Sequence, residues 1–138
     1  MSLSKRSPKK LYINNKKYEK MLKSSTIECF KDSNIDIEPN KISMIMVSVK
    51  DNEPACYLLA EPLIDECMIW AVCTGLKYRS QGCIKTLFKK LFKYFHRYRK
   101  FSLYVYKSNK VVIKIYKKMG FKIVGEYMGN AWKMSLIN

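Results

Sequence analysis

Apolar and polar residues alternate along this chain with two different periods. Runs that are β-branched or strictly alternating are typical of strands, and turn-forming residues separate them. The predicted strands are residues 11–13, 42–49, 55–60, 67–74, 101–106, 121–127 and 131–137. The run at 67–74 is apolar almost throughout, which predicts a strand buried on both faces of a sheet.

Three longer segments have apolar residues at helical spacing instead. They predict helices from Asn14 or Asn15 to about Lys31, over 81–99 and over 109–119, with a loop at 32–40. Asn14 or Asn15 is the candidate N-cap of the first helix, and Gly120 stands where the third needs a left-handed C-cap residue. The second helix has a single apolar stripe, formed by Ile84, Leu87, Phe88, Leu91, Phe92 and Phe95.

This order of elements predicts an α+β fold of mixed α/β type. We expect a central, mostly antiparallel, twisted sheet of six to seven strands flanked by helices, with hairpins toward both ends. The length favours a single domain over residues 11–138. Residues 1–10 are polar and basic and contain Pro8, which predicts a flexible arm.

The net charge of +16 favours an anionic partner. A phosphorylated cofactor, a nucleic acid and an acidic surface all fit a lysine-rich exterior. Most of the basic residues are lysines, which is also what an AT-rich codon bias would produce. The charge therefore leaves open whether the lysine-rich surface has a function.

The cysteines and the apolar runs bear on where the protein works. Five cysteines include no C-x-x-C pair, and the chain has one histidine, so no metal site is predicted. Reduced thiols in an intracellular protein, cytoplasmic or nuclear, are the expectation. No apolar run approaches the roughly 20 residues that span a bilayer, so no membrane insertion is expected.

Two stretches carry candidate chemistry. The first is the basic glycine turn Tyr78-Arg79-Ser80-Gln81-Gly82-Cys83-Ile84, which lies between a buried strand and an amphipathic helix. Helix-start amides have no intrahelical partners and lie at the positive end of the helix dipole, so they bind phosphate. The second stretch is Asn109 followed by Tyr116-x-x-x-Gly120-Phe121.

Together the two stretches resemble the paired motifs of the GNAT N-acetyltransferase superfamily. The first is similar to its Arg/Gln-x-x-Gly-x-Gly/Ala motif and the second to its Tyr-x-x-x-Gly-Phe signature. The resemblance covers about residue 68 to the C-terminus, and the N-terminal half in its element order. Ile84 departs from the motif, because the family has a small residue there.

The resemblance implies a GNAT-like fold and acetyl-CoA as the acetyl donor. It implies that the amides of the glycine turn hold the pyrophosphate and that the end of strand 67–74 pairs with the pantetheine arm. The expected donor-binding residues are Val72, Cys73, Thr74, Arg79, Ser80, Gln81, Gly82, Cys83, Ile84, Asn109 and Tyr116. Cys73 and Cys83 are otherwise expected to be packing residues.

The same resemblance implies direct transfer of the acetyl group to a primary amine of a protein or a small molecule. Tyr116 is the candidate acid, because a phenol with a pKa near 10 is protonated at neutral pH and can protonate the departing thiolate. Glu66 is the candidate base, because it shares strand parity with Met68 and Trp70. Tyr104 is a candidate for the acceptor side.

Other interpretations stay open at this level. The chain could be a catalytically degenerate, basic nucleic-acid-binding or interaction module on the same scaffold. Residues 83–101 also have the pattern of a membrane-surface or calmodulin-binding helix, although that stripe is needed to cover the sheet. The identity of the amine acceptor and the formation of a homodimer are not settled by the sequence.

Overall fold

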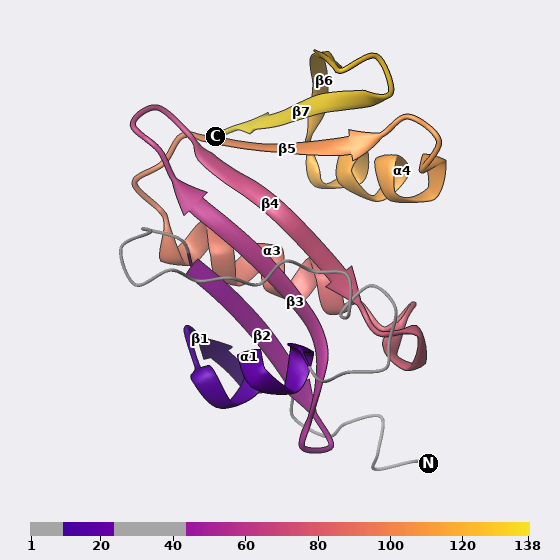
Figure 1. The fold of residues 1–138 in the computed structure, drawn as a ribbon. Coiled ribbons are helices and arrows are strands. Elements are labelled where there is room, and N and C mark those ends of the chain that lie inside the picture. Colours follow the sequence, from indigo (N-terminus) through magenta and orange to yellow (C-terminus); the bar gives the residue numbers. More distant parts are fainter. Residues whose placement is uncertain (1–9, 24–43) are drawn as a thin grey trace. The chain divides into compact units, whose positions relative to one another are not determined.

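The computed structural model describes residues 10–23 and 44–138 (Figure 1). The elements in chain order are β1 (Lys10–Ile13), α1 (Lys16–Lys23), β2 (Met44–Lys50), β3 (Glu53–Pro62), β4 (Cys67–Thr74), the 3-10 helix η2 (Leu76–Tyr78), α3 (Cys83–Tyr94), β5 (Lys100–Tyr106), α4 (Lys110–Met119), β6 (Lys122–Tyr127) and β7 (Ala131–Ile137). The strands form one seven-stranded sheet in the order β1-β2-β3-β4-β5-β7-β6. The predicted mixed α/β class and the size of the sheet are confirmed.

The sheet is mostly antiparallel, as expected. The pairs β1/β2, β5/β7 and β6/β7 are antiparallel, whereas β4 and β5 run parallel over three residue pairs. Asp51 and Asn52, with φ of 54° and 61°, form the two-residue turn between β2 and β3. Asn and Asp tolerate this left-handed conformation, which matches the twist of a tight hairpin.

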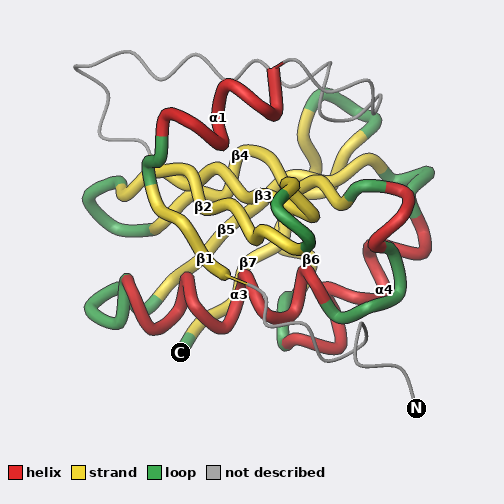
Figure 2. Tube along the Cα trace, turned by 90° about the horizontal axis from the view of Figure 1, so that it is seen from below, coloured by secondary structure: helices red, strands yellow, loops and turns green. Residues whose placement is uncertain are grey.

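The described residues form two compact units, and the first contains residues 10–23, 44–59 and 71–94. Within it, α1 and α3 cover opposite faces of the strands (Figures 1 and 2). The core on the α1 side consists of Tyr18, Leu22, Ile45, Val47, Val49, Tyr57 and Cys73. Alternate residues of β2 supply three of these side chains, as the two-residue period of a strand requires.

Helix α1 begins with a side-chain cap. The Oδ1 atom of Asn15 accepts hydrogen bonds from the backbone amides of Lys17 (3.0 Å) and Tyr18 (3.4 Å). Asn15 is therefore the cap, while Asn14 Oδ1 accepts a bond from Ile45 N at 2.9 Å on β2. The predicted helix beyond Lys23, the loop at 32–40 and most of the arm at 1–10 lie outside the described residues, and Lys10 is already part of β1.

The second unit comprises residues 60–70 and 95–138. It contains the start of β4, then β5, α4, β6 and β7. Phe101 and Leu103 on β5 and Met134 on β7 are buried, with Ile113 and Tyr116 as the buried residues of α4. None of the helices in the described part of the chain is long and apolar enough to cross a membrane.

Two predictions about individual elements were wrong. Helix α3 ends at Tyr94, five residues before the predicted end, because the chain turns at Phe95, whose carbonyl accepts the Tyr98 amide. Strand β4 is not buried throughout, since Trp70 is 51% exposed. Its indole Nε1 donates to Glu61 at 3.0 Å, so the ring has a polar partner at the surface.

Candidate functional site

The glycine turn before α3 has the geometry of an anion site. Ser80 and Gly82 both have left-handed backbone, with φ of 63° and 72°. The first helical hydrogen bond runs from Thr86 N to Gly82 O, so the amides that precede Thr86 have no intrahelical partner. Within residues 10–23 and 44–138, a Cβ atom built on Gly82 meets no atom within 4 Å. Among the described residues, no side chain or backbone therefore covers the Cβ side of Gly82, where a ligand could approach the turn closely.

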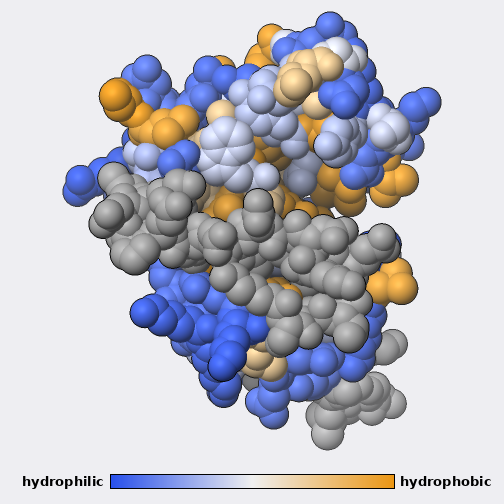
Figure 3. Space-filling view, viewed as in Figure 1, coloured by the Kyte–Doolittle hydropathy of each residue, from blue (hydrophilic) through white to orange (hydrophobic). Residues whose placement is uncertain are grey.

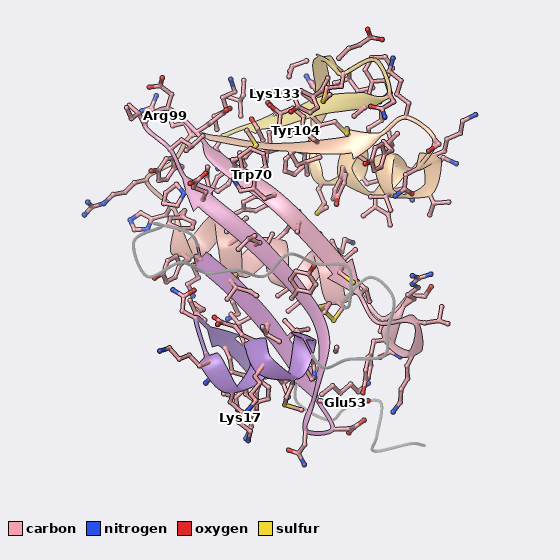
Figure 4. The ribbon with its side chains drawn as sticks, in the orientation of Figure 1. Lys17, Glu53, Trp70, Arg99, Tyr104 and Lys133 are labelled. Atoms are coloured by element: carbon pink, nitrogen blue, oxygen red, sulfur yellow. A yellow bond between two sulfur atoms is a disulfide. The ribbon has the colours of Figure 1, made fainter. Side chains whose placement is uncertain are left out.

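The turn is anchored on the β2–β3 hairpin. The Tyr78 phenol, at the start of the turn, donates a hydrogen bond to the Glu53 carboxylate, and Lys77 Nζ contacts the same oxygen at 2.9 Å. Lys50 Nζ donates to Gln81 Oε1 at 3.0 Å. The hydrogen bonds from Tyr78 and Lys77 lower the pKa of Glu53, so its carboxylate is ionised at neutral pH. The label of Glu53 in Figure 4 marks this end of the hairpin.

A disulfide provides the strongest anchor. Cys83, the first residue of α3, is bonded to Cys56 on β3, with Cα atoms 6.4 Å apart. The expectation of reduced thiols is wrong for this pair, and Cys83 is a covalent tether rather than a packing residue. The two cysteines are distant in sequence and become neighbours only when α3 packs on the sheet. Cys67 is the free cysteine among the described residues, and it is buried.

The end of β4 lies in the same unit as the turn. Val72 and Thr74 are half-buried and Cys73 is buried. Gly75 N donates to Ala55 O at 2.9 Å, which fixes the strand end beside β3. The ladder between β4 and β5 has its last pair at Ile69 and Leu103, whereas β4 itself continues to Thr74.

Ile84 is the position that departs from the motif. The buried side of α3 is formed by Cys83, Leu87, Phe88 and Leu91, while Ile84 and Phe92 are half-buried. The apolar stripe therefore begins at Cys83 rather than at Ile84. The side chain of Ile84 lies at the edge of the helix start, and its amide remains in the first turn.

In the second unit, the Tyr-x-x-x-Gly-Phe signature ends α4. Gly120 has φ of 107°, its amide donates to Lys117 O, and the Phe121 amide donates to Tyr116 O at 3.0 Å. This is a Schellman cap, in which Gly supplies the left-handed residue and the following apolar side chain packs back on the last turn. The rings of Tyr116 and Phe121 are 5.9 Å apart. The Gly120 cap and the contact with Phe121 thus fix the position of the Tyr116 side chain near the C-terminal end of α4.

Tyr116 is buried, with 5% of its surface exposed. Burial raises the pKa of its phenol to about 12. The phenol is therefore fully protonated at neutral pH and can act as a proton donor. Asn109 is exposed and stands at the N-terminus of α4, where its side chain makes no capping bond with the helix amides.

Glu66 directly precedes β4 and lies in a polar cluster with side chains of β5 and β7, in the second unit. Its carboxylate accepts hydrogen bonds from Ser102 Oγ at 2.7 Å and Lys133 Nζ at 3.3 Å, and Lys100 Nζ lies 3.6 Å away. Ser102 also shares a hydrogen bond with Ser135 at 2.7 Å. Burial raises the pKa of Glu66, but these hydrogen bonds and lysine charges outweigh it and hold the pKa below its usual value. Glu66 is therefore an ionised but weakly basic carboxylate.

A row of aromatic rings lies on the face of the second unit's strands that carries Glu66. Tyr104 on β5 stacks on Trp70 with centroids 6.0 Å apart, and its other neighbour is Tyr127 at 4.4 Å. Figure 4 shows Trp70, Tyr104 and Lys133 on adjoining strands of this unit. Trp70 and Tyr127 are about half exposed. The row is a surface on which a flat or apolar group can lie.

The candidate residues fall into two sets, one in each unit. The turn residues and the end of β4 belong to the first unit, whereas Glu66, Asn109 and Tyr116 belong to the second. The sequence interpretation missed Lys50, Glu53 and Cys56, which support the turn. No local pattern identifies them, because their role depends on the packing of the β2–β3 hairpin against η2 and α3. No group of three or more metal-ligand side chains occurs within residues 10–23 and 44–138.

Comparison with known proteins gives one family. The sequence model of the acetyltransferase (GNAT) family matches residues 11–121. A search of curated proteins gives no match.

Solved structures with the same fold include several acetyltransferases. The ribosomal-protein-S18-alanine N-acetyltransferase of Escherichia coli has a TM-score of 0.75 at 13% identity, over 94% of each chain. Ard1 of Thermoplasma volcanium has a TM-score of 0.73 at 17% identity, over 94% of this chain and 97% of that one. The PaiA N-acetyltransferase of Thermoplasma acidophilum, solved with coenzyme A, has a TM-score of 0.65 at 19% identity. That match covers 68% of this chain and 60% of the PaiA chain.

Proposed function

The chain belongs to the GNAT acetyltransferase family, and we propose that it transfers the acetyl group of acetyl-CoA to a primary amine of a protein or a small molecule. The family establishes acetyl transfer with acetyl-CoA as the donor. The observation that carries the proposal is the open, anchored turn at Gly82, which presents helix-start amides to an anion.

In this proposal the turn holds the pyrophosphate of acetyl-CoA. The amides of Gln81, Gly82, Cys83 and Ile84 are the donors, and Arg79 and Ser80 lie exposed beside them. The pantetheine arm pairs with the backbone of Val72, Cys73 and Thr74, where β4 continues past its ladder with β5. The proposal is supported by the disulfide at Cys83, because a fixed helix start is already organised for the ligand.

Tyr116 is the proposed acid. Coenzyme A leaves as a thiolate, and the buried phenol, with its pKa of about 12, carries a proton at every physiological pH. Asn109 is proposed to bond the donor with a side-chain amide that the helix does not use as a cap.

Glu66 is the proposed base for the amine. Its bonds to Ser102 and Lys133 reduce its basicity, so the amine or a bridging water has to replace one of these partners. The aromatic row of Trp70, Tyr104 and Tyr127 lies on the same strand face as Glu66, which supports placing the acceptor there. Tyr104 is accordingly proposed as an acceptor-side residue.

Calorimetric titration with acetyl-CoA tests the donor site. Gly82→Glu places a carboxylate at the anion site, and we expect it to abolish binding. Gly129→Glu is the matched control, because Gly129 also has a left-handed φ, of 76°, and no atom within 4 Å of an added Cβ. Wild-type affinity in the control together with loss in Gly82→Glu supports the site. Unchanged binding in Gly82→Glu would remove the turn from the proposal.

A second assay addresses the amine. Release of the coenzyme A thiol is measured with a peptide carrying a free N-terminus, with a blocked peptide carrying one lysine, and with a small diamine. Release that requires one of these amines supports N-acetylation. Tight acetyl-CoA binding without amine-dependent release would refute amine transfer, and absence of acetyl-CoA binding would favour a basic interaction module on this scaffold.

A further inference from the structure

Helix α4 presents a face made almost entirely of lysines. Its exposed residues are Lys110, Val111, Lys114, Lys117 and Lys118, and the last three lie four, seven and eight residues after Lys110. Residues at these spacings share one side of a helix. We call Lys110, Lys114, Lys117 and Lys118 the α4 lysine face. The opposite side contains the buried Ile113 and Tyr116, so this face is turned away from the core.

Nothing in the described structure neutralises this face. The ion pairs of residues 10–23 and 44–138 involve Lys77, Lys100, Lys107 and Lys133, and none of the four α4 lysines. The sequence contains no aspartate or glutamate from residue 67 to residue 125. Helix α4 therefore has no acidic side chain of its own.

The arrangement is unfavourable for the helix alone. Lysines at i and i+4, such as Lys110 and Lys114, repel each other. Lys110 also lies in the first turn, at the positive end of the helix dipole, where an acidic residue would stabilise the helix. Helix α1 follows that rule, with Glu19 in its first turn, whereas α4 has no acidic residue there. Lys117 and Lys118 suit the last turn, but the rest of the face is not explained by helix stability.

Helix α3 repeats the pattern independently. Its exposed lysines are Lys85, Lys89, Lys90 and Lys93, and its first turn also has no acidic residue. Helix α1 differs, because its lysines share the helix with an acidic residue, Glu19. The surface over α1 is hydrophilic in Figure 3. The unneutralised stripe is thus a property of α3 and α4 and not of every helix.

We propose that the α4 lysine face binds the phosphate backbone of a nucleic acid. Lysine is a flexible point charge that contacts phosphate without reading sequence. From Lys110 to Lys118 the helix rises by about 12 Å along its axis. This length spans several phosphates of a duplex, which carries about one charge per 1.7 Å. Val111 is the exposed large apolar residue of α4, so the helix lacks the broad apolar side by which surface helices enter a lipid bilayer.

Fluorescence anisotropy with a labelled 20-base-pair DNA duplex and a labelled single-stranded RNA, over 50–200 mM salt, tests this proposal. The test variant is Lys114→Gln/Lys117→Gln/Lys118→Gln. The control Lys16→Gln/Lys17→Gln/Lys20→Gln removes the same charge from the exposed side of α1. A third variant, Lys114→Arg/Lys117→Arg/Lys118→Arg, keeps the charge. An acidic peptide and anionic vesicles serve as competitors.

The expected result is salt-dependent binding that the test variant weakens. Three lost phosphate contacts reduce the log–log salt slope for the duplex by about 2 to 3, with at least a tenfold loss of affinity. The α1 control and the arginine variant should stay near wild type. Equal losses in the test variant and the α1 control would show an effect of net charge alone and overturn the proposal. The absence of binding at 50 mM salt would also overturn the proposal, as would preferential binding of the acidic peptide or the vesicles. Calorimetry with acetyl-CoA should give wild-type affinity for the test variant, which separates this result from the donor site.

Discussion

Cys83 and Cys56 join the start of α3 to β3 through a disulfide that closes a loop of 27 residues. The bond fixes the residue directly after Gly82, on which the proposed donor site depends. Loss of a disulfide closing a loop of this length costs about 3–4 kcal/mol in the chain-entropy model. The tether is thus both a stability element and a constraint on the site.

We predict that Cys56→Ala/Cys83→Ala lowers the free energy of unfolding by about this amount. Urea denaturation with and without a reductant measures it, and the reductant should destabilise the wild type more than the double variant. Cys67→Ala is the control for the reductant effect. Burial raises the pKa of the Cys67 thiol to about 12, so this thiol takes no part in thiol–disulfide exchange. An equal reductant effect in the wild type and the double variant would contradict the prediction.

The bond from Tyr78 to Glu53 should matter for donor binding. Tyr78→Phe removes the phenol that fixes the turn on the hairpin, and the affinity for acetyl-CoA should fall by about tenfold, as expected for a hydrogen bond to a charged group. Calorimetry measures the change. Tyr94→Phe, which alters an exposed ring on α3, should leave affinity unchanged. Wild-type affinity in Tyr78→Phe would mean that the phenol is not needed to hold the turn in its binding geometry.

Tyr116→Phe should lower kcat by about 100-fold to 10,000-fold while leaving the KM for acetyl-CoA nearly unchanged. Phenylalanine keeps the packing on Phe121 and removes the proton donor. Tyr106→Phe, at an exposed position, is the control for the assay. A proportional rise in KM with unchanged kcat would assign Tyr116 to binding rather than to proton transfer.

Tyr116 should also make the stability of the fold depend on pH in alkaline solution. Its pKa is about 12 in the folded chain and near the reference value of 10.0 in the unfolded chain, so the folded state holds the proton more tightly. This tighter proton binding contributes fully to the stability of the fold below pH 10, and the contribution is lost as pH rises from 10 to 12. The difference in melting temperature between the wild type and Tyr116→Phe should therefore change across this window and stay constant below it. A constant difference throughout would refute the shift.

Glu66→Gln should destabilise the fold at neutral pH by about 1–3 kcal/mol, because it removes the charge that Lys133 and Lys100 face. The pKa of Glu66 is lowered, so its contribution is complete above about pH 4.5 and disappears as pH falls through the folded-state pKa. The gap in unfolding free energy between wild type and variant should close in acid. Glu126→Gln, at an exposed ion pair, is the control. A gap that persists in acid would contradict this account.

Gly120→Ala should cost more stability than Gly129→Ala. Both positions are left-handed, which costs a non-glycine residue about 1–2 kcal/mol. At Gly120 the new Cβ also lies 2.8 Å from Leu136 Cδ1, whereas at Gly129 it meets nothing. Urea denaturation compares the two, and adding Leu136→Ala should reduce the extra cost. Equal costs would show that Leu136 moves aside freely.

Periodicity along the chain was sufficient for the element order, since it reports which side of each segment is apolar. It failed at boundaries that depend on distant contacts. Helix α3 ends at Tyr94 although the lysine and aromatic pattern continues. The phenol of Tyr98, beyond the helix end, donates a hydrogen bond to Leu63 O at 2.7 Å. The exposure of Trp70 likewise depends on Glu61 and Tyr104, which no window around residue 70 identifies as neighbours.

The sequence by itself determined the glycine turn, the Tyr-x-x-x-Gly-Phe helix end and the family that both indicate, because left-handed glycines and caps are local requirements. Only the tertiary structure decided what supports them. It joined Cys83 to Cys56, gave Tyr78 the Glu53 carboxylate and surrounded Glu66 with Ser102 and Lys133. These partners lie 25 to 67 residues apart, and a partner at that separation is fixed by the packing of strands and helices rather than by any local pattern.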